Sequence, residues 1–236
     1  MKILALESSA TACSVALCED ERLIAQTFQN SGLTHSRTLM PMAEELLVAC
    51  GQKPDEVDVV AVAAGPGSFT GLRIGVATAK GLGWAWQKPC APCSTLESMA
   101  WQLAHTDAIV VAVMDARRSQ VYNAIFRAEG GRLQRLAPDR AVALADVEAE
   151  LKNLPGRKIL VGDGAQLCYN EWQERVPELC MAPEHLRWQS AWGVARAALD
   201  LVRQDGLVSA EQLAPVYHRL SQAERERLAK QTDTKE

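Results

Sequence analysis

The chain has 236 residues, a formal net charge of −4 and 48% hydrophobic residues, enough apolar side chains for one large core or two smaller ones. The acidic balance argues against a protein that grips nucleic acid unaided, because such binding depends on neutralising phosphates with Lys and Arg. Only residues 3–6 form an apolar run between Lys2 and Glu7, so the start predicts neither a signal peptide nor a membrane span. We therefore expect a cytoplasmic protein with no membrane contact.

A pattern of strands occurs twice along the chain. The strand-like runs of the first half and their counterparts after residue 105 are 3–6, 14–17 and 23–28, then 109–114, 121–126 and a run from 133. In each half the first run ends in an acid, Glu7 or Asp115. Later, the run 158–161 and its Gly-Asp-Gly turn resemble the run 57–64 and its glycine loop. The repetition predicts an internal duplication.

Residues 65–75 read Gly-Pro-Gly-Ser-Phe-Thr-Gly-Leu-Arg-Ile-Gly and join the run 57–64 to a helix-like run, 72–86. A glycine loop between a strand and a helix lets the backbone approach an anion at the positive helix start. The loop lacks the lysine of a Walker motif, the spacing of a dinucleotide motif and the glycines of a nucleophile elbow around Ser68. Two interpretations stay open: a phosphate or nucleotide loop, and a tight turn without a ligand.

Apolar spacing and capping signals predict helices between the strands, at 35–50, 71–86, 94–103, 144–151, 166–176 and 190–204. Strands in threes, followed by alternating helix and strand, indicate an α/β protein with a duplicated actin-like, ribonuclease-H-like fold. Each lobe should hold a mixed sheet with flanking helices. We predict a first lobe at 1–105, a second at 106–220 and a polar, disordered tail at 221–236.

Two acid-ended hairpins facing a cleft could orient Mg²⁺ and nucleotide phosphates, as in actin-type ATPases. The candidate residues of this cleft are Glu7, Ser8, Ser9, Gly65, Gly67, Ser68, Asp115 and Arg118. The alternative is that the two acids merely end strands and that the Arg117-Arg118 pair fills a cleft that has lost its ligand. The site would then be vestigial.

Four histidines, 35, 105, 185 and 218, stand far apart, and no H-x-x-x-H or H-E-x-x-H pair occurs. Such pairs place two imidazoles on one helical face, so we expect no metal on this chain and no zinc peptidase activity. Trp84, Trp86 and Trp101 are expected in the core or between the lobes, because no basic residues alternate with them.

Small residues recur every four positions from Gly71 to Gly83 and give the predicted helix a flat ridge. We predict a partner-docking surface made of this ridge and the apolar face of helix 35–50, with the residues Leu39, Met42, Leu46, Gly75, Ala79 and Gly83. The alternative is that the ridge packs against the lobe's own sheet or against helix 35–50. Under the docking interpretation, Gly75→Leu should abolish partner binding and leave the monomer folded.

Three segments together resemble the TsaB (YeaZ) family of bacteria: the opening 3–9, the loop 65–73 and Met-Asp-Ala-Arg-Arg-Ser-Gln-Val-Tyr at 114–122. The resemblance covers residues 1 to about 220. It implies an actin-like fold and a role in making threonylcarbamoyladenosine beside the anticodon of tRNAs that read codons starting with A. It also implies a non-catalytic subunit whose paralogue, TsaD, performs the transfer with threonylcarbamoyl-adenylate and a metal held by its own histidines.

As the resemblance implies, the chain pairs with the TsaD-like enzyme through helices of the first lobe, helps recruit a TsaE-like ATPase and forms a homodimer in the partner's absence. It binds no cofactor alone, since ATP and metal belong to the complex, and tRNA reaches it only through the complex. Two other functions are weighed against this one. A stand-alone actin-like ATPase is suggested by Glu7, Asp115 and the glycine loop, and a peptidase by a former name of the wider family.

Overall fold

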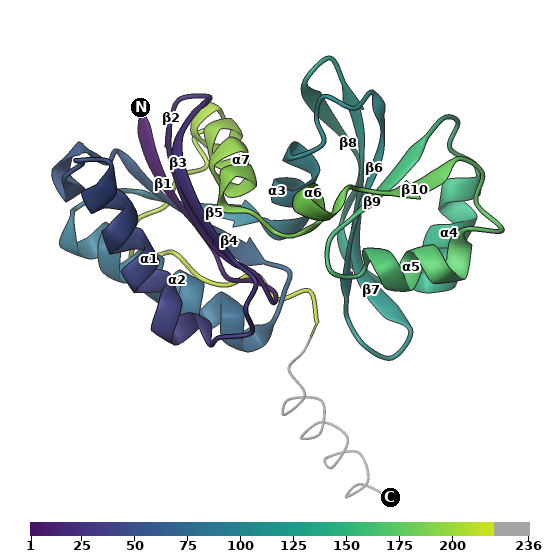
Figure 1. Cartoon of the computed structure of the whole chain (residues 1–236), viewed down its shortest axis with the longest axis horizontal. Coiled ribbons are helices and arrows are strands. Elements are labelled where there is room, and N and C mark those ends of the chain that lie inside the picture. The colour runs from purple at the N-terminus through teal and green to yellow at the C-terminus, as the bar shows by residue number, and fades with distance from the viewer. Residues whose placement is uncertain (220–236) are drawn as a thin grey trace, which may run out of the picture.

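The structure is a computed structural model that describes residues 1–219 and shows two lobes side by side (Figure 1). The elements of the first half are β1 (Lys2–Glu7), β2 (Cys13–Glu19), β3 (Arg22–Gln29), α1 (His35–Ala49), the short 3₁₀ helix η1 (Pro54–Glu56), β4 (Val59–Gly65), α2 (Phe69–Ala85), β5 (Cys90–Ser94) and α3 (Thr95–Trp101). Those of the second half are β6 (Ala108–Asp115), β7 (Gln120–Glu129), β8 (Arg132–Ala143), α4 (Leu144–Lys152), β9 (Lys158–Val161), α5 (Ala165–Trp172), β10 (Leu179–Met181), α6 (Glu184–Arg187) and α7 (Ala191–Arg203).

The two sheets have the same strand order, which confirms the predicted duplication. The first runs β3-β2-β1-β4-β5 and the second β8-β7-β6-β9-β10. In each sheet, the first three strands along the chain pair antiparallel. The other two add in parallel: β4 pairs with β1 and β5 with β4, and likewise β9 pairs with β6 and β10 with β9. Glu7 and Asp115 end equivalent strands, β1 and β6. This order, with helices on both faces, is the predicted actin-like fold.

Each sheet is buried on both faces, and this explains why its central strands are almost wholly apolar. On the first sheet, α1 and α2 cover the outer face and α7 covers the face toward the second lobe. On the second sheet, α4 and α5 cover the outer face, while α3 lies on the face toward the first lobe. Figure 1 shows α3, α6 and α7 between the two sheets. Helices from both halves therefore form the junction of the lobes.

The division of the chain differs from the predicted boundaries, 1–105 and 106–220. Helix α7 belongs to the second half of the sequence, but its alanines pack on Ile3 and Ala5 of the first sheet. Conversely, α3 follows β5, and its Leu96 and Met99 lie in the core of the second sheet. The two halves thus exchange their last helices, because each lobe buries one sheet face with a helix from the other half.

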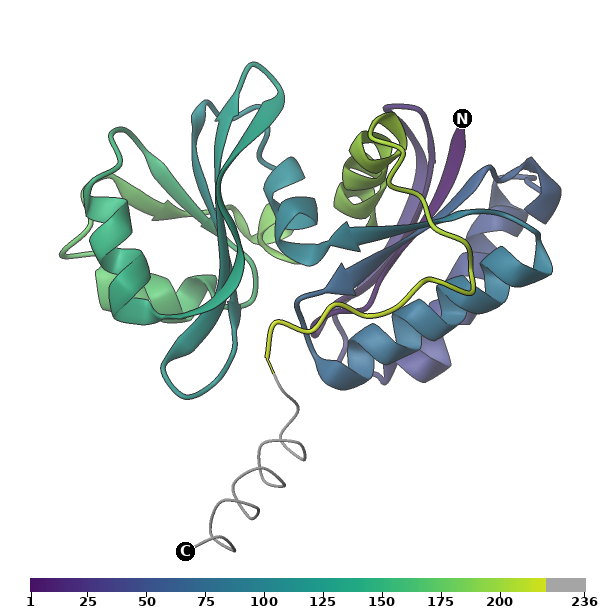
Figure 2. The ribbon, with the colours of Figure 1, turned by 180° about the vertical axis from the view of Figure 1, so that it is seen from behind.

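The segment after α7 also returns to the first lobe. Val208 and Cys90 exchange two backbone hydrogen bonds of 2.8 and 2.9 Å, and the ammonium of Lys80 donates to the carbonyls of Glu211 and Leu213 at 3.0 Å each. Figure 2 shows this yellow segment running along the first lobe to the point between the lobes. The predicted tail, 221–236, lies outside the described residues.

Candidate functional site

The turn after β1 holds three of the candidate cleft residues, and all three are buried. Glu7 Oε1 accepts a hydrogen bond from the backbone N–H of Ser9 at 2.6 Å, and Ser8 Oγ donates to the carbonyl of Gly71 at 2.9 Å. Within the described chain, Glu7 Oε2 and Ser9 Oγ have no hydrogen-bond partner. The turn is therefore held by two of its side-chain oxygens, and two others have no hydrogen-bond partner in the described part of the chain.

The glycine loop of the first lobe is packed directly against this turn. The N–H of Ser68 donates to the Ser9 carbonyl at 2.7 Å, and a Cβ on Gly67 would lie 2.5 Å from that same oxygen. A Cβ on Gly71 would lie 2.1 Å from the Ser8 carbonyl. The glycines thus serve close approach between backbones, which is the tight-turn interpretation of the loop.

The C-terminal segment occupies the other side of the glycine loop. The N–H of Val216 donates to the Ala64 carbonyl at 2.8 Å, and a Cβ on Gly65 would lie 2.1 Å from the Val216 carbonyl oxygen. Here Gly65 has a φ of +144°, a conformation that side chains disfavour. The loop is held between two segments of its own chain. Ser68 caps α2 by accepting from the Gly71 N–H at 3.4 Å, so its hydroxyl has a structural role.

The second hairpin presents its acid differently. Asp115 is 40% exposed at its side chain, and its Oδ1 accepts from the Arg117 N–H at 2.7 Å. Arg117, Arg118 and Ser119 all have positive φ values, 66°, 57° and 56°, so the turn is left-handed throughout. Arg118 is exposed, and its side chain makes no hydrogen bond or ion pair within residues 1–219. Asp115 and Glu7 are therefore equivalent in topology but differ in burial.

Asp163, in the Gly-Asp-Gly turn after β9, is a residue near the junction of the lobes that the sequence interpretation did not select. Its Oδ1 accepts from Gln189 Nε2 at 2.8 Å, and burial raises the pKa of its carboxyl. Burial likewise raises the pKa of Glu7 to about 7, and the negative charge of Asp163 contributes a smaller increase. The position of Asp163 after a strand equivalent to β4 was the signal that could have identified it. The fully buried Glu7 of the first lobe thus feels the charge of the partly buried Asp163 of the second lobe.

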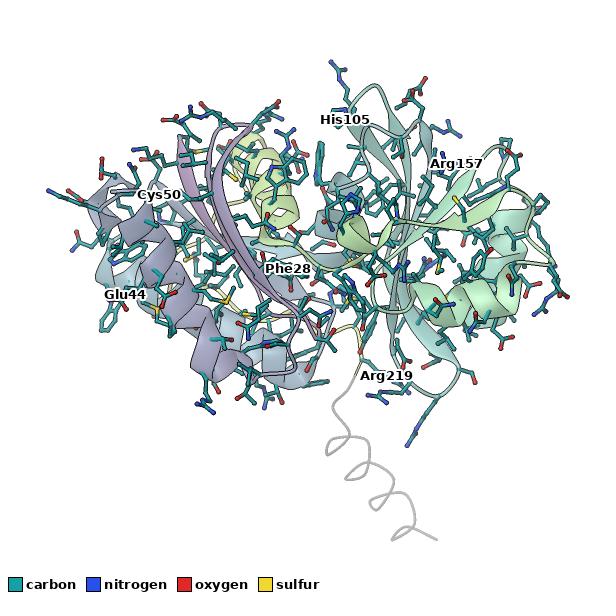
Figure 3. The ribbon with its side chains drawn as sticks, viewed as in Figure 1. Phe28, Glu44, Cys50, His105, Arg157 and Arg219 are labelled. Atoms are coloured by element: carbon teal, nitrogen blue, oxygen red, sulfur yellow. The ribbon has the colours of Figure 1, made fainter. Side chains whose placement is uncertain are left out.

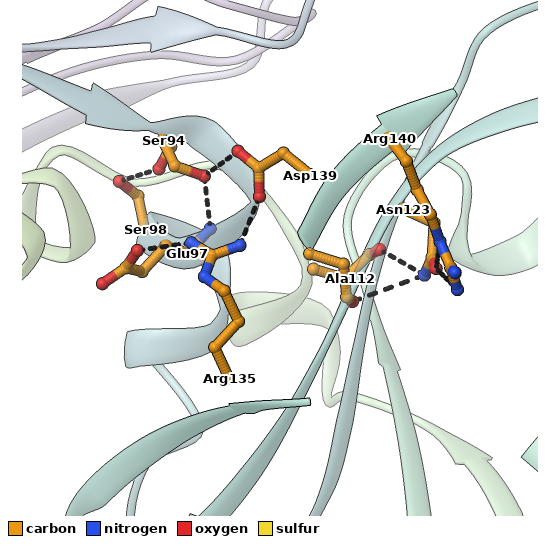
Figure 4. A network of polar contacts seen from close by, with 9 residues as sticks. Ser94, Glu97, Ser98, Ala112, Asn123, Arg135, Asp139 and Arg140 are labelled. Atoms are coloured by element: carbon orange, nitrogen blue, oxygen red, sulfur yellow. Dashed lines mark hydrogen bonds and ion pairs between the residues drawn. The ribbon is translucent and has the colours of Figure 1, made fainter. Parts of the chain in front are cut away.

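A polar network ties the lobes together beside this site (Figure 4). Arg135 on β8 forms ion pairs of 2.5 Å with both Glu97 on α3 and Asp139. Ser94 Oγ donates to Asp139 Oδ2 at 2.5 Å and accepts from the Glu97 N–H at 3.1 Å, which confirms the predicted N-cap of α3. The network joins the end of β5 in the first lobe to β8 in the second.

Within residues 1–219, no group of three or more His, Cys, Asp or Glu side chains is arranged to hold a metal ion. His35, at the start of α1, has its Nε2 2.6 Å from the Ala10 carbonyl oxygen. No helix in the described part of the chain is long and apolar enough to cross a membrane.

The predicted docking residues do not form an outer surface, and this prediction is wrong. Leu39, Met42, Leu46 and Ala79 are each at most 8% exposed and lie in the core beneath α1 and α2. Gly75 is equally enclosed, since a Cβ there would lie 2.4 Å from Ser8 Oγ. Gly83 faces inward as well, with a hypothetical Cβ 2.6 Å from Cys90 Sγ. The small-residue ridge packs on the first lobe's own sheet, as the alternative interpretation had it.

The opposite face of α2 is the one that reaches the surface. Ala77 and Gly81 are exposed, and nothing lies within 4 Å of a Cβ built on Gly81. Trp84 is 82% exposed, contrary to the core position expected from the sequence, whereas Trp101 is buried and stacked with Arg196. The residues 77, 81 and 84 share one helical face, a spacing that the sequence contained but that the inner glycine row obscured.

Comparison with known proteins supports one family. A family model described as TsaD, tRNA N6-adenosine threonylcarbamoyltransferase, matches residues 29–186. The chain is 35% identical over 167 residues to the tRNA threonylcarbamoyladenosine biosynthesis protein TsaB of Bacillus subtilis, covering 71% of this chain and 73% of that protein. It is 29% identical over 225 residues to TsaB of Escherichia coli, covering 93% and 95%.

Solved structures agree with these matches. YeaZ from Pseudomonas aeruginosa superposes with a TM-score of 0.74 at 27% identity and covers 92% of this chain and all 100% of its own. The ethanolamine utilization protein EutJ from Carboxydothermus hydrogenoformans shares only the fold, with a TM-score of 0.51 at 12% identity and coverage of 84% and 90%. From the duplicated sheets, the motifs and these relatives together, the chain belongs to the TsaB (YeaZ) family.

Proposed function

We propose that this chain is a subunit of the machinery that makes threonylcarbamoyladenosine in tRNA, and that it acts by docking onto a TsaD-type transferase without performing the transfer itself. The names of its relatives support the tRNA modification. The match of this chain to the TsaD family model supports a partner that is a paralogue with the same duplicated fold. Because the substrate is tRNA, we place the chain in the cytoplasm.

The exposed face of α2 is the observation that supports docking best. Trp84 leaves 82% of its surface in solvent, although a Trp side chain is among the most favourable to bury in an interface. The small residues Ala77 and Gly81 beside it allow another helix to approach closely. On the neighbouring α1, Val48 and Met40 are 74% and 42% exposed. Together these five residues form the docking face of this proposal.

The charges around the docking face indicate the chemistry of the partner. Glu44 and Glu45 are exposed on α1 between Met40 and Val48, and Figure 3 shows Glu44 on the outer side of this helix. An apolar stripe with acids beside it is best matched by a partner surface that is apolar with a basic rim. We propose that the same face forms a homodimer when the transferase is absent, and that a TsaE-like ATPase joins the resulting complex.

The packing of the cleft supports a non-catalytic role. Ser9 and Val216 contact the two sides of the glycine loop, where a nucleotide phosphate would otherwise approach the backbone. We propose that the isolated chain binds no nucleotide and that ATP and the metal ion are held by its partners. A stand-alone ATPase would instead show tight binding of ATP and Mg²⁺ by calorimetry on the isolated chain.

Two matched substitutions test the docking face. Ala77→Glu places a charge on the exposed face of α2, and Ala149→Glu places the same charge on an exposed position of α4 in the other lobe. We expect Ala77→Glu to stop co-eluting with the TsaD-type partner and to bind it at least about tenfold more weakly by calorimetry. Ala149→Glu should bind like the natural chain. Equal binding by both variants, with both folded, would show that docking uses another surface.

A further inference from the structure

Three arginines line two adjoining hollows at the end of the second lobe where β6 and β9 begin. A hollow of about 510 Å³ is lined by Arg127, Arg157 and the turns at Gly130 and Gly156. A second hollow of about 380 Å³ continues from it along Arg127 to Arg132. Because β6 and β9 begin at this edge and β7 ends there, it is the opposite edge from Asp115 and Asp163. Figure 3 shows His105 and Arg157 at this end of the lobe and Arg219 far from it, between the lobes.

The three guanidinium groups are free to bind a ligand. Among residues 1–219, the side chains of Arg127 and Arg132 make no hydrogen bond or ion pair, and the Arg157 side chain makes only a 3.4 Å contact from Nε to Cys180 Sγ. Elsewhere in this lobe, arginines such as Arg135 and Arg175 are paired with carboxylates. Exposed guanidinium groups without carboxylate partners, gathered around one concavity, are suited to phosphate, which accepts two parallel hydrogen bonds from each.

The remaining groups of the hollow limit how strongly it can bind. Asp107 and Glu129 line the larger hollow and balance the charges of Arg127 and Arg157 there, so only Arg132 of the adjoining hollow leaves an excess of one positive charge. Asp107 Oδ1 is engaged by the N–H of Gly130 at 3.0 Å, whereas Glu129 has no ion pair within the described chain. His105 adds a ring at the same turn, since a Cβ on Gly131 would lie 2.7 Å from its Cε1. Such a site adds phosphate contacts to a nucleic acid that another protein already holds, and this agrees with an acidic chain that does not grip RNA alone.

We propose that this arginine hollow contacts the phosphodiester backbone of the tRNA while the transferase partner holds it. The proposal rests on the proposed function for the identity of the RNA and adds a direct contact from this chain. The site does not overlap with the docking face, which lies on α1 and α2 of the other lobe. One assembly can therefore use both surfaces at once.

The test compares two triple variants that remove three positive charges each. The first is Arg127→Gln, Arg132→Gln and Arg157→Gln; the control is Arg22→Gln, Lys53→Gln and Arg203→Gln on the first lobe. Binding of a labelled tRNA transcript is measured by fluorescence anisotropy against salt concentration, with each chain alone and mixed with the TsaD-type partner. In the mixture we expect the hollow variant to bind about tenfold more weakly, and the salt slope to fall by about 2 to 3. The control should stay within about twofold of the natural chain.

Equal affinities for the natural chain and the hollow variant, or equal losses in both variants, would overturn the proposal. A threonylcarbamoylation assay on the same mixtures separates this failure from that of the proposed function. If the natural mixture modifies tRNA and the hollow variant binds tRNA unchanged, only the hollow contact is wrong. If the natural chain does not associate with the partner, the proposed function fails, and the titrations with each chain alone at low salt decide the hollow contact by the same comparison.

Discussion

At the scale of single residues, Glu7 shows how the junction between the lobes is built. Glu7 ends the first strand, as its position in the repeat predicted, but it is fully buried and its Oε2 has no partner in residues 1–219. The sequence could locate this acid because it follows an apolar run. It could not show the burial, because that depends on tertiary packing, in which β1 lies between β2 and β4 in the sheet.

Burial of Glu7 predicts a pH dependence of stability. Its folded pKa is raised from 4.5 to about 7, so the native state holds a proton that the unfolded chain releases. This proton stabilises the folded state, and that contribution to the free energy of unfolding is fully present below about pH 4.5 and is lost as the pH rises through 7. We expect Glu7→Gln to remove this dependence. Its free energy of unfolding should exceed that of the natural chain by up to about 3 kcal/mol between pH 5 and 8. Urea unfolding at several pH values measures the difference, and parallel curves for the two proteins would contradict it.

At the scale of elements, α2 shows how one helix can carry two small-residue rows with different purposes. The inner row, including Gly75, lies on the sheet and on the turn after β1, whereas Gly81 is open to solvent. Helical periodicity predicted α2, α1 and α7 to within a few residues. It could not tell which row of α2 faces inward, because glycine and alanine carry too little hydrophobic signal to mark a buried face.

Substitution of one glycine in each row tests this assignment. Gly75→Leu should destabilise the fold by at least about 2 kcal/mol, because its Cβ would lie 2.4 Å from Ser8 Oγ and 3.3 Å from Val62 Cγ2. Gly81→Leu should leave the free energy of unfolding unchanged or raise it by up to about 1 kcal/mol, since leucine favours helix and finds open space. Thermal and denaturant unfolding measure the free energy of unfolding of the two variants. Equal results for the two variants would contradict this assignment and would agree with the expectation from the sequence that Gly75→Leu leaves the monomer folded.

The segment after α7 is the element that sequence patterns described least. Tyr217 stacks on Phe69 with ring centroids 4.5 Å apart, and its hydroxyl accepts from Arg73 Nε at 3.1 Å. Arg219 then donates to the Ala116 carbonyl in the second lobe. Neither contact follows from periodicity, because both join residues more than 100 positions apart.

Hydrogen exchange tests whether the stack secures this segment. Tyr217→Ala should speed exchange of the Val216 N–H, which is bonded to Ala64, by about tenfold or more, because the stack no longer holds the segment. Tyr217→Phe keeps the ring and loses only the hydroxyl, so it should exchange nearly as slowly as the natural chain. The N–H of Ile109, bonded to Arg157 in the second lobe, serves as the internal control. Unchanged protection of Val216 in Tyr217→Ala would mean that the backbone bonds alone hold it.

For the whole molecule, the repeat of strand-like runs predicted the duplicated fold correctly, because each half of the sequence forms a sheet with the same strand order. The exchange of α3 and α7 between the lobes was not predicted. Both helices bury an apolar face, and an apolar face alone does not specify which of the two sheets the helix packs against. The exchange matters for function because it joins the lobes through buried helices and the network around Arg135, leaving α1 and α2 on the outside.

We propose that the molecule acts through its outer helices on a partner that performs the chemistry. The most direct measurement is threonylcarbamoylation of a tRNA transcript by the TsaD-type partner, together with its ATPase, in the presence of the natural chain, Ala77→Glu or Ala149→Glu. We expect the tRNA to be modified with the natural chain and with Ala149→Glu, and not by this chain alone. With Ala77→Glu, the rate of modification should fall by at least about tenfold. Turnover by the isolated chain, or full activity of Ala77→Glu, would contradict it.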